Sequence, residues 1–218
     1  MSRGKLVLFE GLDRTGKTTQ SDILVERLQP DVTLIKFPER STEIGALIDR
    51  YLKDKTFELP DQAVHLLFSA NRWEMAERIK QLLLQGTHVV LDRYVYSGIA
   101  YSAAKHTDKM DRSWCLQPDR GLPRPDLTIF LTSDDAENEL RAGFGEERYE
   151  KSEFQQEVKR QFIEVFKALE DNSQEQNLVQ IINITGKSVE QVANEVWELT
   201  EPVVRAPTDS KNTEILYF

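Results

Sequence analysis

The segment Gly11–Thr18, read as Gly-Leu-Asp-Arg-Thr-Gly-Lys-Thr, constrains the fold of this chain more than any other feature. It matches the pattern G-x-x-x-x-G-K-[ST], and it stands between an apolar run, Lys5–Glu10, and a helical pattern, Gly16–Gln29. Glycine lets the backbone turn so tightly that successive N–H groups point inward around an anion. A loop of this kind between a strand and a helix predicts an α/β phosphate-binding fold.

Residues inside this loop have separate chemical uses. The following helix adds the partial positive charge of its N-terminus. Lys17 is expected to reach the β and γ phosphates of a nucleotide, and Thr18 to ligate Mg²⁺. Switches, motors and transporters also carry such loops, so the motif alone does not establish a kinase. Arg14 favours phosphoryl transfer, because an arginine supplied in cis can stabilise charge on the transferred group; a solvated surface charge is the alternative.

The rest of the chain alternates short apolar runs with helical patterns, which predicts parallel βαβ units and a three-layer α/β fold of the P-loop NTPase type. We expect a five-stranded parallel sheet flanked by helices on both faces. The expected strands are Lys5–Glu10, Val32–Phe37, His88–Asp92, Leu127–Leu131 and Val179–Ile184. The expected helices are Gly16–Gln29, Gln62–Gln85, Tyr94–Lys105, Phe154–Asp171 and Ser188–Thr200.

Two segments do not fit this alternation. Thr107–Pro125 contains three prolines and a glycine, so we expect a long surface connection. The segment Pro202–Phe218 is polar until its last four residues; a frayed terminus is the favoured interpretation, with docking on the body or on a partner chain as the alternative. We predict a single domain over residues 1–206, followed by a tail over 207–218.

Composition excludes several classes of protein. The chain has 218 residues and 39% hydrophobic content, enough for one full core. A net charge of -9 argues against a protein that holds a nucleic-acid polymer, although aimed arginines can still bind a small anion. One cysteine, Cys115, allows no intrachain disulfide, and three scattered histidines show no metal-ligand spacing. With no membrane-length apolar run, the cytosol is the favoured compartment and the nucleus the alternative.

Three groups of residues outside the loop suggest an acceptor site. Asp92 and Arg93 follow a predicted strand, where the carboxylate could support magnesium through water and the arginine could bridge phosphates; an N-cap with an exposed arginine is the alternative. Ser97 and Tyr101 share a face of the next helix, although Tyr101 could equally be core. Phe37 and Arg40 follow the second predicted strand, where the arginine could clamp a monophosphate.

A second pair and a glycine-interrupted segment add to this site. Phe68 and Arg72 lie four residues apart on one predicted helix, so the ring could stack on a base while the arginine donates to its carbonyl oxygen. A buried phenylalanine beside a surface arginine is the commoner explanation of such a pair. Between Arg141 and Tyr149, two glycines interrupt a basic stretch, which suits a lid over about residues 138–152; a charged loop is the alternative.

Taken together and in order, these stretches resemble the thymidylate kinase family, which makes dTDP from dTMP and ATP. The matching stretches extend over most of residues 4–160: FEGLDRTGKTTQ, FPERSTEIG, LLFSANRWE, VVLDRYVYSGIAYSAAK, GLPRPDLTIFL and FGEERYE. WCLQPDRGLPRPD is similar to the eukaryotic branch. The resemblance implies ATP and dTMP as substrates, Mg²⁺ as cofactor and a homodimer. It leaves two rivals: a sibling kinase with another acceptor, and a nucleotide-dependent switch.

The resemblance also implies roles for individual residues. Asp13 would bond the 3′-hydroxyl of dTMP, and Tyr101 would crowd the ribose 2′ position. The implied catalytic residues are Arg14, Lys17, Asp92 and Arg93, with Thr18 and, through water, Asp92 on the metal. The implied ATP site comprises Gly11, Asp13, Arg14, Thr15, Gly16, Lys17, Thr18, Thr19 and Arg141. The implied dTMP site comprises Asp13, Phe37, Arg40, Phe68, Arg72, Arg93, Ser97, Gly98, Tyr101, Tyr149 and Gln155. Direct in-line transfer would need no covalent intermediate.

Overall fold

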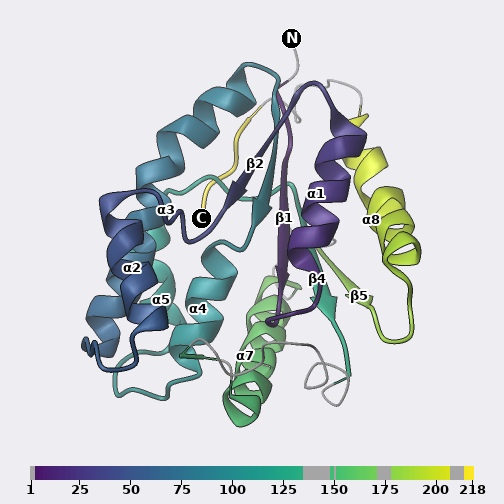
Figure 1. Cartoon of the computed structure of the whole chain (residues 1–218). Helices are drawn as coiled ribbons and strands as arrows, with labels where there is room; N and C mark the ends of the chain where they lie inside the picture. Colours follow the sequence, from purple (N-terminus) through teal and green to yellow (C-terminus); the bar gives the residue numbers. More distant parts are fainter. Residues whose placement is uncertain (1–2, 135–147, 150, 171–177, 207–213) are drawn as a thin grey trace.

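A five-stranded, all-parallel sheet forms the centre of the computed structural model (Figure 1). The structure describes residues 3–134, 148–149, 151–170, 178–206 and 214–218. The strand order is β2-β3-β1-β4-β5. The strands are β1 (Leu6–Gly11), β2 (Val32–Lys36), β3 (His88–Asp92), β4 (Leu127–Thr132) and β5 (Val179–Asn183). The predicted fold class is therefore confirmed, and each expected strand is present within one residue at either end.

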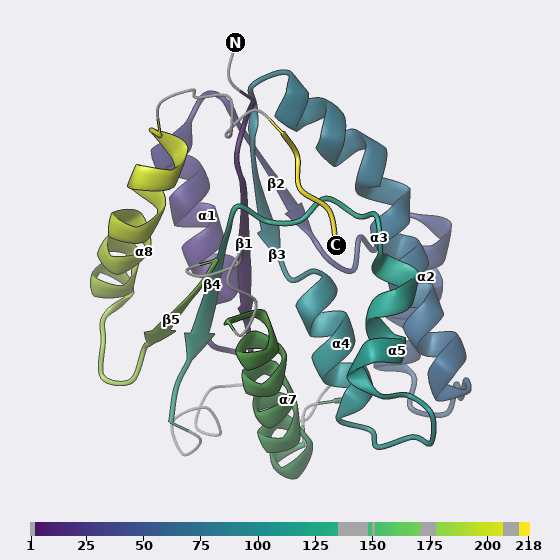
Figure 2. The ribbon, with the colours of Figure 1, turned by 180° about the vertical axis from the view of Figure 1, so that it is seen from behind.

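Helices cover both faces of the sheet (Figures 1 and 2). On one face lie α1 (Lys17–Leu28) and α8 (Val189–Val204). On the other lie α3 (Asp61–Leu84), α4 (Val95–Ala103) and α7 (Ser152–Glu170). Alternate side chains of β1 fill two separate cores, since Val7 and Phe9 pack under α1 and α8 whereas Leu6 and Leu8 pack on the opposite face. Burial on both sides explains the continuous apolar runs Leu6–Phe9 in β1 and Val89–Leu91 in β3.

The carboxyl ends of the strands meet at the lower edge of the sheet in Figure 1, which is where the site lies. In the register of β1 with β3, Phe9 stands opposite Asp92, and the backbone N–H of Arg93 donates to the Phe9 carbonyl at 2.9 Å. The end of β3 and the loop after β1 are thereby fixed side by side. Within the described part of the chain, no helix has the length and apolar character to cross a membrane.

Three local expectations are corrected by the structure. The sequence patterns did not predict α2 (Glu43–Lys53), although Thr42 caps it by accepting from the Gly45 N–H at 2.9 Å. The segment Thr107–Pro125 is not simply a surface connection. It contains α5 (Arg112–Leu116) and a 3₁₀ turn, η1 (Gln117–Asp119), and it buries Cys115 and Asp119 completely. Finally, α8 continues past Pro202 to Val204, although proline cannot donate the backbone hydrogen bond to the residue four positions before it.

The end of the chain docks on the body, so the favoured interpretation of a frayed terminus is wrong for residues 214–218. The Phe218 N–H donates to the Leu122 carbonyl, and the Phe218 carbonyl accepts from Gly121, both at 3.0 Å. The Phe218 ring lies 6.1 Å from the ring of Tyr94 and 5.4 Å from that of Tyr96. Figure 2 shows this terminal segment running beside the connection into β4. Residues 214–218 are therefore packed against the body of the protein, with Phe218 beside two aromatic rings of the segment that begins α4.

Candidate active site

The loop between β1 and α1 has the backbone shape that phosphate binding requires. Gly11 adopts φ +150°, and a Cβ there would lie 2.4 Å from the Leu131 carbonyl oxygen, so only glycine fits. Gly16 adopts φ +80° immediately before α1. Arg14 also adopts a left-handed conformation, at φ +67°, which costs an L residue about 1 kcal/mol. Internal bonds hold this shape, since the Thr15 hydroxyl donates to the Leu12 carbonyl at 3.0 Å.

Lys17 lies inside this loop and is almost fully buried. Its ammonium group donates to the Leu12 carbonyl oxygen. Burial, with the nearby charge of Arg93, lowers the pKa of Lys17 to about 7, while Asp13, Asp92 and Glu10 act in the opposite direction. Between about pH 7 and the ordinary lysine pKa of 10.5, Lys17 therefore binds fewer protons in the folded protein than in the unfolded chain. The cost of burying the charge is largest below pH 7 and is relieved as the pH rises.

Thr18 and Asp92 form the part of the site that suits a magnesium ion. The Thr18 hydroxyl donates to Asp92 Oδ2 at 2.7 Å, at the junction of the phosphate loop and the end of β3. Both supply hard oxygen ligands, which Mg²⁺ prefers, and the ion commonly completes its shell with water and substrate phosphates. Accordingly, the described residues contain no cluster of three acidic, histidine or cysteine side chains that could cage a metal alone.

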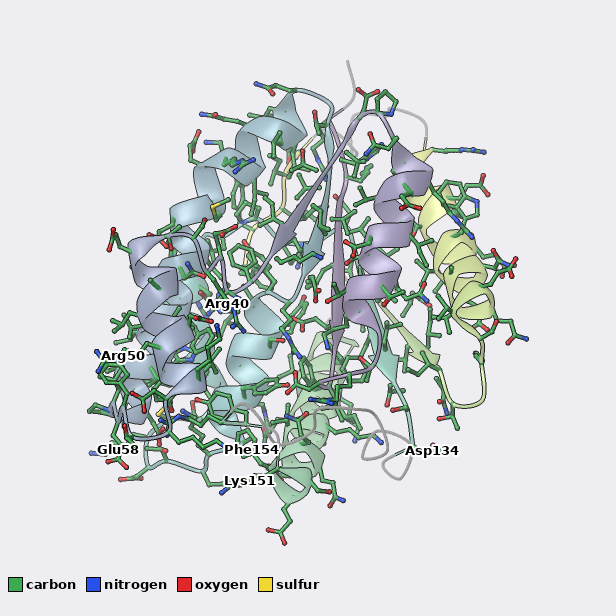
Figure 3. The ribbon with its side chains drawn as sticks, in the orientation of Figure 1. Arg40, Arg50, Glu58, Asp134, Lys151 and Phe154 are labelled. Atoms are coloured by element: carbon green, nitrogen blue, oxygen red, sulfur yellow. The ribbon has the colours of Figure 1, made fainter. Side chains whose placement is uncertain are left out.

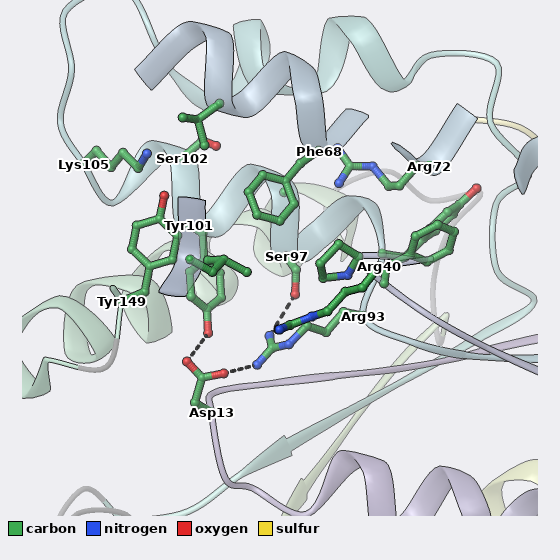
Figure 4. Close-up of a pocket in the computed structure, with 16 residues that line it drawn as sticks. Asp13, Arg40, Phe68, Arg72, Arg93, Ser97, Tyr101, Ser102, Lys105 and Tyr149 are labelled. Atoms are coloured by element: carbon green, nitrogen blue, oxygen red, sulfur yellow. Dashed lines mark hydrogen bonds and ion pairs between the residues drawn. The ribbon is translucent and has the colours of Figure 1, made fainter. Parts of the chain in front are cut away.

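Arg93 joins the phosphate loop to the helix α4. Its guanidinium pairs with Asp13 of the loop, and it donates at 3.1 Å both to the Gly11 carbonyl and to the Ser97 hydroxyl (Figure 4). It also lies over the ring of Tyr101, with its central carbon 5.3 Å from the ring centroid. Burial opposes the charge on Arg93, but Tyr101 and the surrounding carboxylates raise its pKa. Arg93 is thus charged, and its side chain is only 19% exposed, so the alternative of an exposed arginine is excluded.

Asp13 is held by groups from three other elements. Besides Arg93, it accepts from the Tyr101 hydroxyl at 3.1 Å and from Gln155 Nε2 on α7 at 2.9 Å. Burial would raise the pKa of Asp13, but Arg93, Lys17 and these hydrogen bonds hold it below its ordinary value. The loop carboxylate is therefore ionised and fixed in place. Gln155 thus contributes to the site through two hydrogen bonds, one to Asp13 and one to the Tyr149 carbonyl at 3.0 Å.

The sequence patterns did not single out Glu10, which lies fully buried behind Arg93. Its Oε1 accepts from the backbone N–H groups of Tyr94 and Ser97, and its Oε2 accepts from the Ser97 hydroxyl. Burial raises the pKa of Glu10 in spite of these bonds. No side chain of α4 caps its own first turn, so Glu10 takes that place from the end of β1. A charged residue ending an apolar strand was the signal available in the sequence.

A pocket opens between α4, the ends of β1 and β3, and the helices α2 and α3 (Figure 4). It contains every residue of the implied dTMP site except Gln155. These residues are Asp13, Phe37, Arg40, Phe68, Arg72, Arg93, Ser97, Gly98, Tyr101 and Tyr149. The sequence patterns missed six further lining residues: Pro38, Leu52, Val64, Tyr94, Ser102 and Lys105. Pro38, Tyr94, Ser102 and Lys105 lie within the stretches that resemble the family, but nothing in their spacing assigned them to the site. Leu52 and Val64 lie outside those stretches.

Phe68 and Arg72 lie on one wall of this pocket, from adjacent turns of α3. Arg72 is only 2% exposed, so the commoner explanation of a surface arginine does not hold. Arg40 lies between α2 and α4 in Figure 3, where it pairs with Asp49, whereas Arg50 lies on the outer side of α2. Phe37 is buried with its ring 5.4 Å from that of Tyr94. The pocket therefore has an aromatic and arginine wall at one end and a charged end beside the phosphate loop.

Arg148 and Tyr149 lie just before α7, and Tyr149 lines one side of the pocket. Arg148 donates to the carbonyl oxygens of Tyr51, Asp54 and Phe57, each between 2.9 and 3.0 Å. These bonds fix the position of Tyr149, whose ring stacks on that of Phe154 with centroids 5.3 Å apart. Figure 3 places Phe154 near the start of α7, at the same edge of the sheet as the strand ends. Arg141 and most of the predicted lid, residues 138–147 and 150, lie outside the described residues.

Comparison with known proteins agrees with this geometry. The family model described as thymidylate kinase matches residues 9–196. The chain is 45% identical to the thymidylate kinase of Schizosaccharomyces pombe over 205 residues, covering 93% of this chain and 94% of that protein. It is 44% identical to the human thymidylate kinase, covering 98% and 97%. The chain belongs to the thymidylate kinase family.

Solved structures agree as well. A thymidylate kinase structure from Candida albicans, described as revealing the origin of broad substrate specificity, superposes with a TM-score of 0.86 at 46% identity, covering 100% of this chain and 99% of that one. A thymidylate kinase from Ehrlichia chaffeensis, at 24% identity and a TM-score of 0.69, shows the shared fold. The predictions of a thymidylate kinase, with ATP as donor and dTMP as acceptor, are confirmed. The chain is a phosphotransferase rather than a switch.

The lowered pKa of Lys17 leads to a testable prediction about protons. At pH 8 much of Lys17 is neutral in the free enzyme, and contact with phosphates favours the charged form. Binding of a non-hydrolysable ATP analogue with Mg²⁺ should therefore take up a large fraction of one proton. Calorimetric titration in buffers of different ionisation enthalpy measures this uptake. Lys17→Arg, whose side chain stays charged, should show none at the same pH. Equal uptake by both proteins would contradict the assignment to Lys17.

Proposed function

We propose that the pocket between α3 and α4 binds dTMP while the loop Gly11–Thr18 binds ATP, and that the γ-phosphoryl group passes directly between them. One observation carries this proposal: Asp13 belongs to the phosphate loop, yet its carboxylate lines the acceptor pocket and pairs with Arg93. A single turn of the chain therefore faces both substrates. Such an arrangement supplies proximity and orientation, which dominate the catalysis of phosphoryl transfer.

Each end of the acceptor has residues of suitable chemistry. Phe68 supplies a ring to stack on thymine, and Arg72 supplies donors for its O4 oxygen. At the other end, Arg93 and Arg40 supply charge for the 5′-phosphate. Asp13 is available to the 3′-hydroxyl as an ionised acceptor. The ring of Tyr101, fixed by its bond to Asp13, occupies the space where a ribose 2′-hydroxyl would add bulk.

On the donor side, charge neutralisation is the main requirement. Lys17 contacts the β and γ phosphates, and Arg14 in the same loop reaches the transferred group as a cis arginine. The oxygens of Thr18 and Asp92 would hold Mg²⁺, directly and through water. When bound, the ion would neutralise the β and γ oxygens of ATP. Since an acceptor phosphate is already nucleophilic, the chain needs no dedicated general base. Arg141 against adenine and a lid over about residues 138–152 remain predictions.

An acceptor panel tests this function. With ATP and Mg²⁺ present, coupled release of ADP should be fastest with dTMP among the common nucleoside monophosphates. Thymidine should not be phosphorylated, because it lacks the phosphate that Arg40 and Arg93 would hold. Phosphorylation of thymidine but not of dTMP would identify a nucleoside kinase and reject the proposed acceptor.

The same assay tests the role of Arg14. Arg14→Ala should lower kcat by roughly two orders of magnitude or more, because a cis arginine acts on charge in the transition state. The KM for dTMP should stay within about threefold, since Arg14 acts on the donor side. An unchanged kcat would contradict the assigned role of Arg14.

Two apolar side chains on α3 support a homodimer. Leu66 and Trp73 are 47% and 43% exposed and lie seven residues apart, so they share one side of the helix. We expect the full chain to sediment as a dimer at micromolar concentration, and Leu66→Glu to dissociate it. Ile181→Glu, at a position on β5 that is 58% exposed, should leave the dimer intact. A monomeric parent protein would contradict this.

The cytosol, with the nucleus as the alternative, remains the predicted compartment.

A further inference from the structure

Arg72 does not stand alone in the pocket wall, because a buried carboxylate holds it. Asp119, on η1, accepts from Arg72 Nε at 3.1 Å and from Arg72 Nη2 at 2.6 Å. The side chains are 3% and 0% exposed. A bidentate pair of this kind fixes the plane of the guanidinium as well as its position. Without the carboxylate, a buried guanidinium would be uncompensated, which is strongly unfavourable.

Asp119 is itself fixed to the helix that carries Arg72. The Ser69 hydroxyl lies 2.7 Å from Asp119 Oδ1 and 3.1 Å from the Pro118 carbonyl. The Trp73 indole N–H donates to the same Pro118 carbonyl at 2.7 Å. These contacts tie η1 to one face of α3, between Ser69 and Trp73. The carboxylate therefore has little freedom to follow Arg72 into another orientation.

Gly98 on α4 closes the other side of the guanidinium. A Cβ at Gly98 would lie 2.7 Å from Arg72 Nη2 and 2.9 Å from Nη1, so the group packs directly on the backbone of α4. Asp119 uses the Nε–H and one Nη2–H, which leaves the Nη1 donors for the pocket. Figure 4 shows Arg72 beside Phe68 at the wall opposite Asp13. The pocket thus presents a fixed edge that can donate hydrogen bonds and cannot accept them.

We propose that Asp119 is a positioning residue that determines base specificity in this kinase. By holding Arg72, it selects an acceptor base with a carbonyl oxygen at this edge and rejects a base with an amino group there. An amino group of the base would face the N–H donors of Arg72, and these buried N–H groups would be left unpaired. Sites of this type discriminate strongly against analogues that lack the matching group. This inference rests on the proposed function of the pocket as the dTMP site.

The test compares dTMP with the monophosphate of 5-methylpyrimidin-2-one deoxyriboside, which lacks the O4 oxygen and, with it, the N3–H. The readout is therefore the change in preference between the parent enzyme and its variants, since the difference at N3 is common to all of them. The parent enzyme should prefer dTMP in kcat/KM by about 10- to 100-fold, the loss expected for a hydrogen bond from a charged donor. In Asp119→Asn the KM for dTMP should rise at least about tenfold, while the KM for the analogue changes by less than about threefold. If Asp119 had only a structural role, Asp119→Asn would raise the KM for both acceptors by the same factor.

Two further variants make the result independent of folding defects. Ser69→Ala removes one hydrogen bond to Asp119 but keeps the ion pair, so it should reduce the preference for O4 in the same direction by a smaller factor. Asp126→Asn is the matched control, since Asp126 forms a largely buried bidentate pair with Arg3 outside the pocket, at 2.8 and 2.6 Å. It should lower the unfolding temperature and leave the preference unchanged.

The outcomes separate the inference from the function on which it rests. If Asp119→Asn folds and keeps the full preference for dTMP over the analogue, this would overturn the positioning role of Asp119. If Asp119→Asn does not fold, an unchanged preference in Ser69→Ala would overturn it. A parent enzyme that phosphorylates both acceptors equally would remove the role of Arg72 and Asp119 in specificity, while the dTMP kinase activity would stand. Failure to phosphorylate dTMP at all would instead reject the proposed function.

Discussion

The ion pair between Arg93 and Asp13 connects the two halves of this active site, and the arrangement of the other polar groups depends on it. Asp13 belongs to the loop after β1, and Arg93 follows β3, so the pair bridges neighbouring strands of the sheet. Both groups are ionised although both are largely buried, since each stabilises the charge of the other. Without Arg93, the carboxyl groups of Asp13 and Glu10 would each lose a nearby positive charge that favours the ionised form.

The pair also determines how the helices are placed around the pocket. Arg93 donates to Ser97, and Ser97 donates to Glu10, which caps the first turn of α4. Asp13 in turn holds Tyr101 of α4 and Gln155 of α7. The phosphate loop, α4 and α7 are thereby joined through a single network of hydrogen bonds. Such a network fixes the acceptor pocket relative to the donor loop before either substrate binds, which favours preorganised transfer.

Much of the fold and part of the site could be predicted from local patterns. The phosphate loop, the five strands and the pairs Phe68–Arg72 and Ser97–Tyr101 each depend on spacing within one element. The helix α2 was missed although its signal is local, since Thr42 can cap it and Ile44, Leu47, Ile48, Tyr51 and Leu52 recur at helical spacing. Glu10 and Asp119 could not be assigned because their partners lie 84 to 87 and 47 to 50 residues away. Such contacts are set by the packing of whole elements.

The measurement that tests this network most directly is a double-mutant cycle on the dissociation constant of dTMP. Calorimetry would compare the parent protein with Asp13→Asn, Arg93→Lys and the double variant. We expect each single change to weaken binding, and the double variant to bind at least about 1 kcal/mol better than the sum of the two losses predicts, because paired residues in one network are energetically coupled. Additive losses, or single variants that bind dTMP as tightly as the parent, would contradict the central role of the pair.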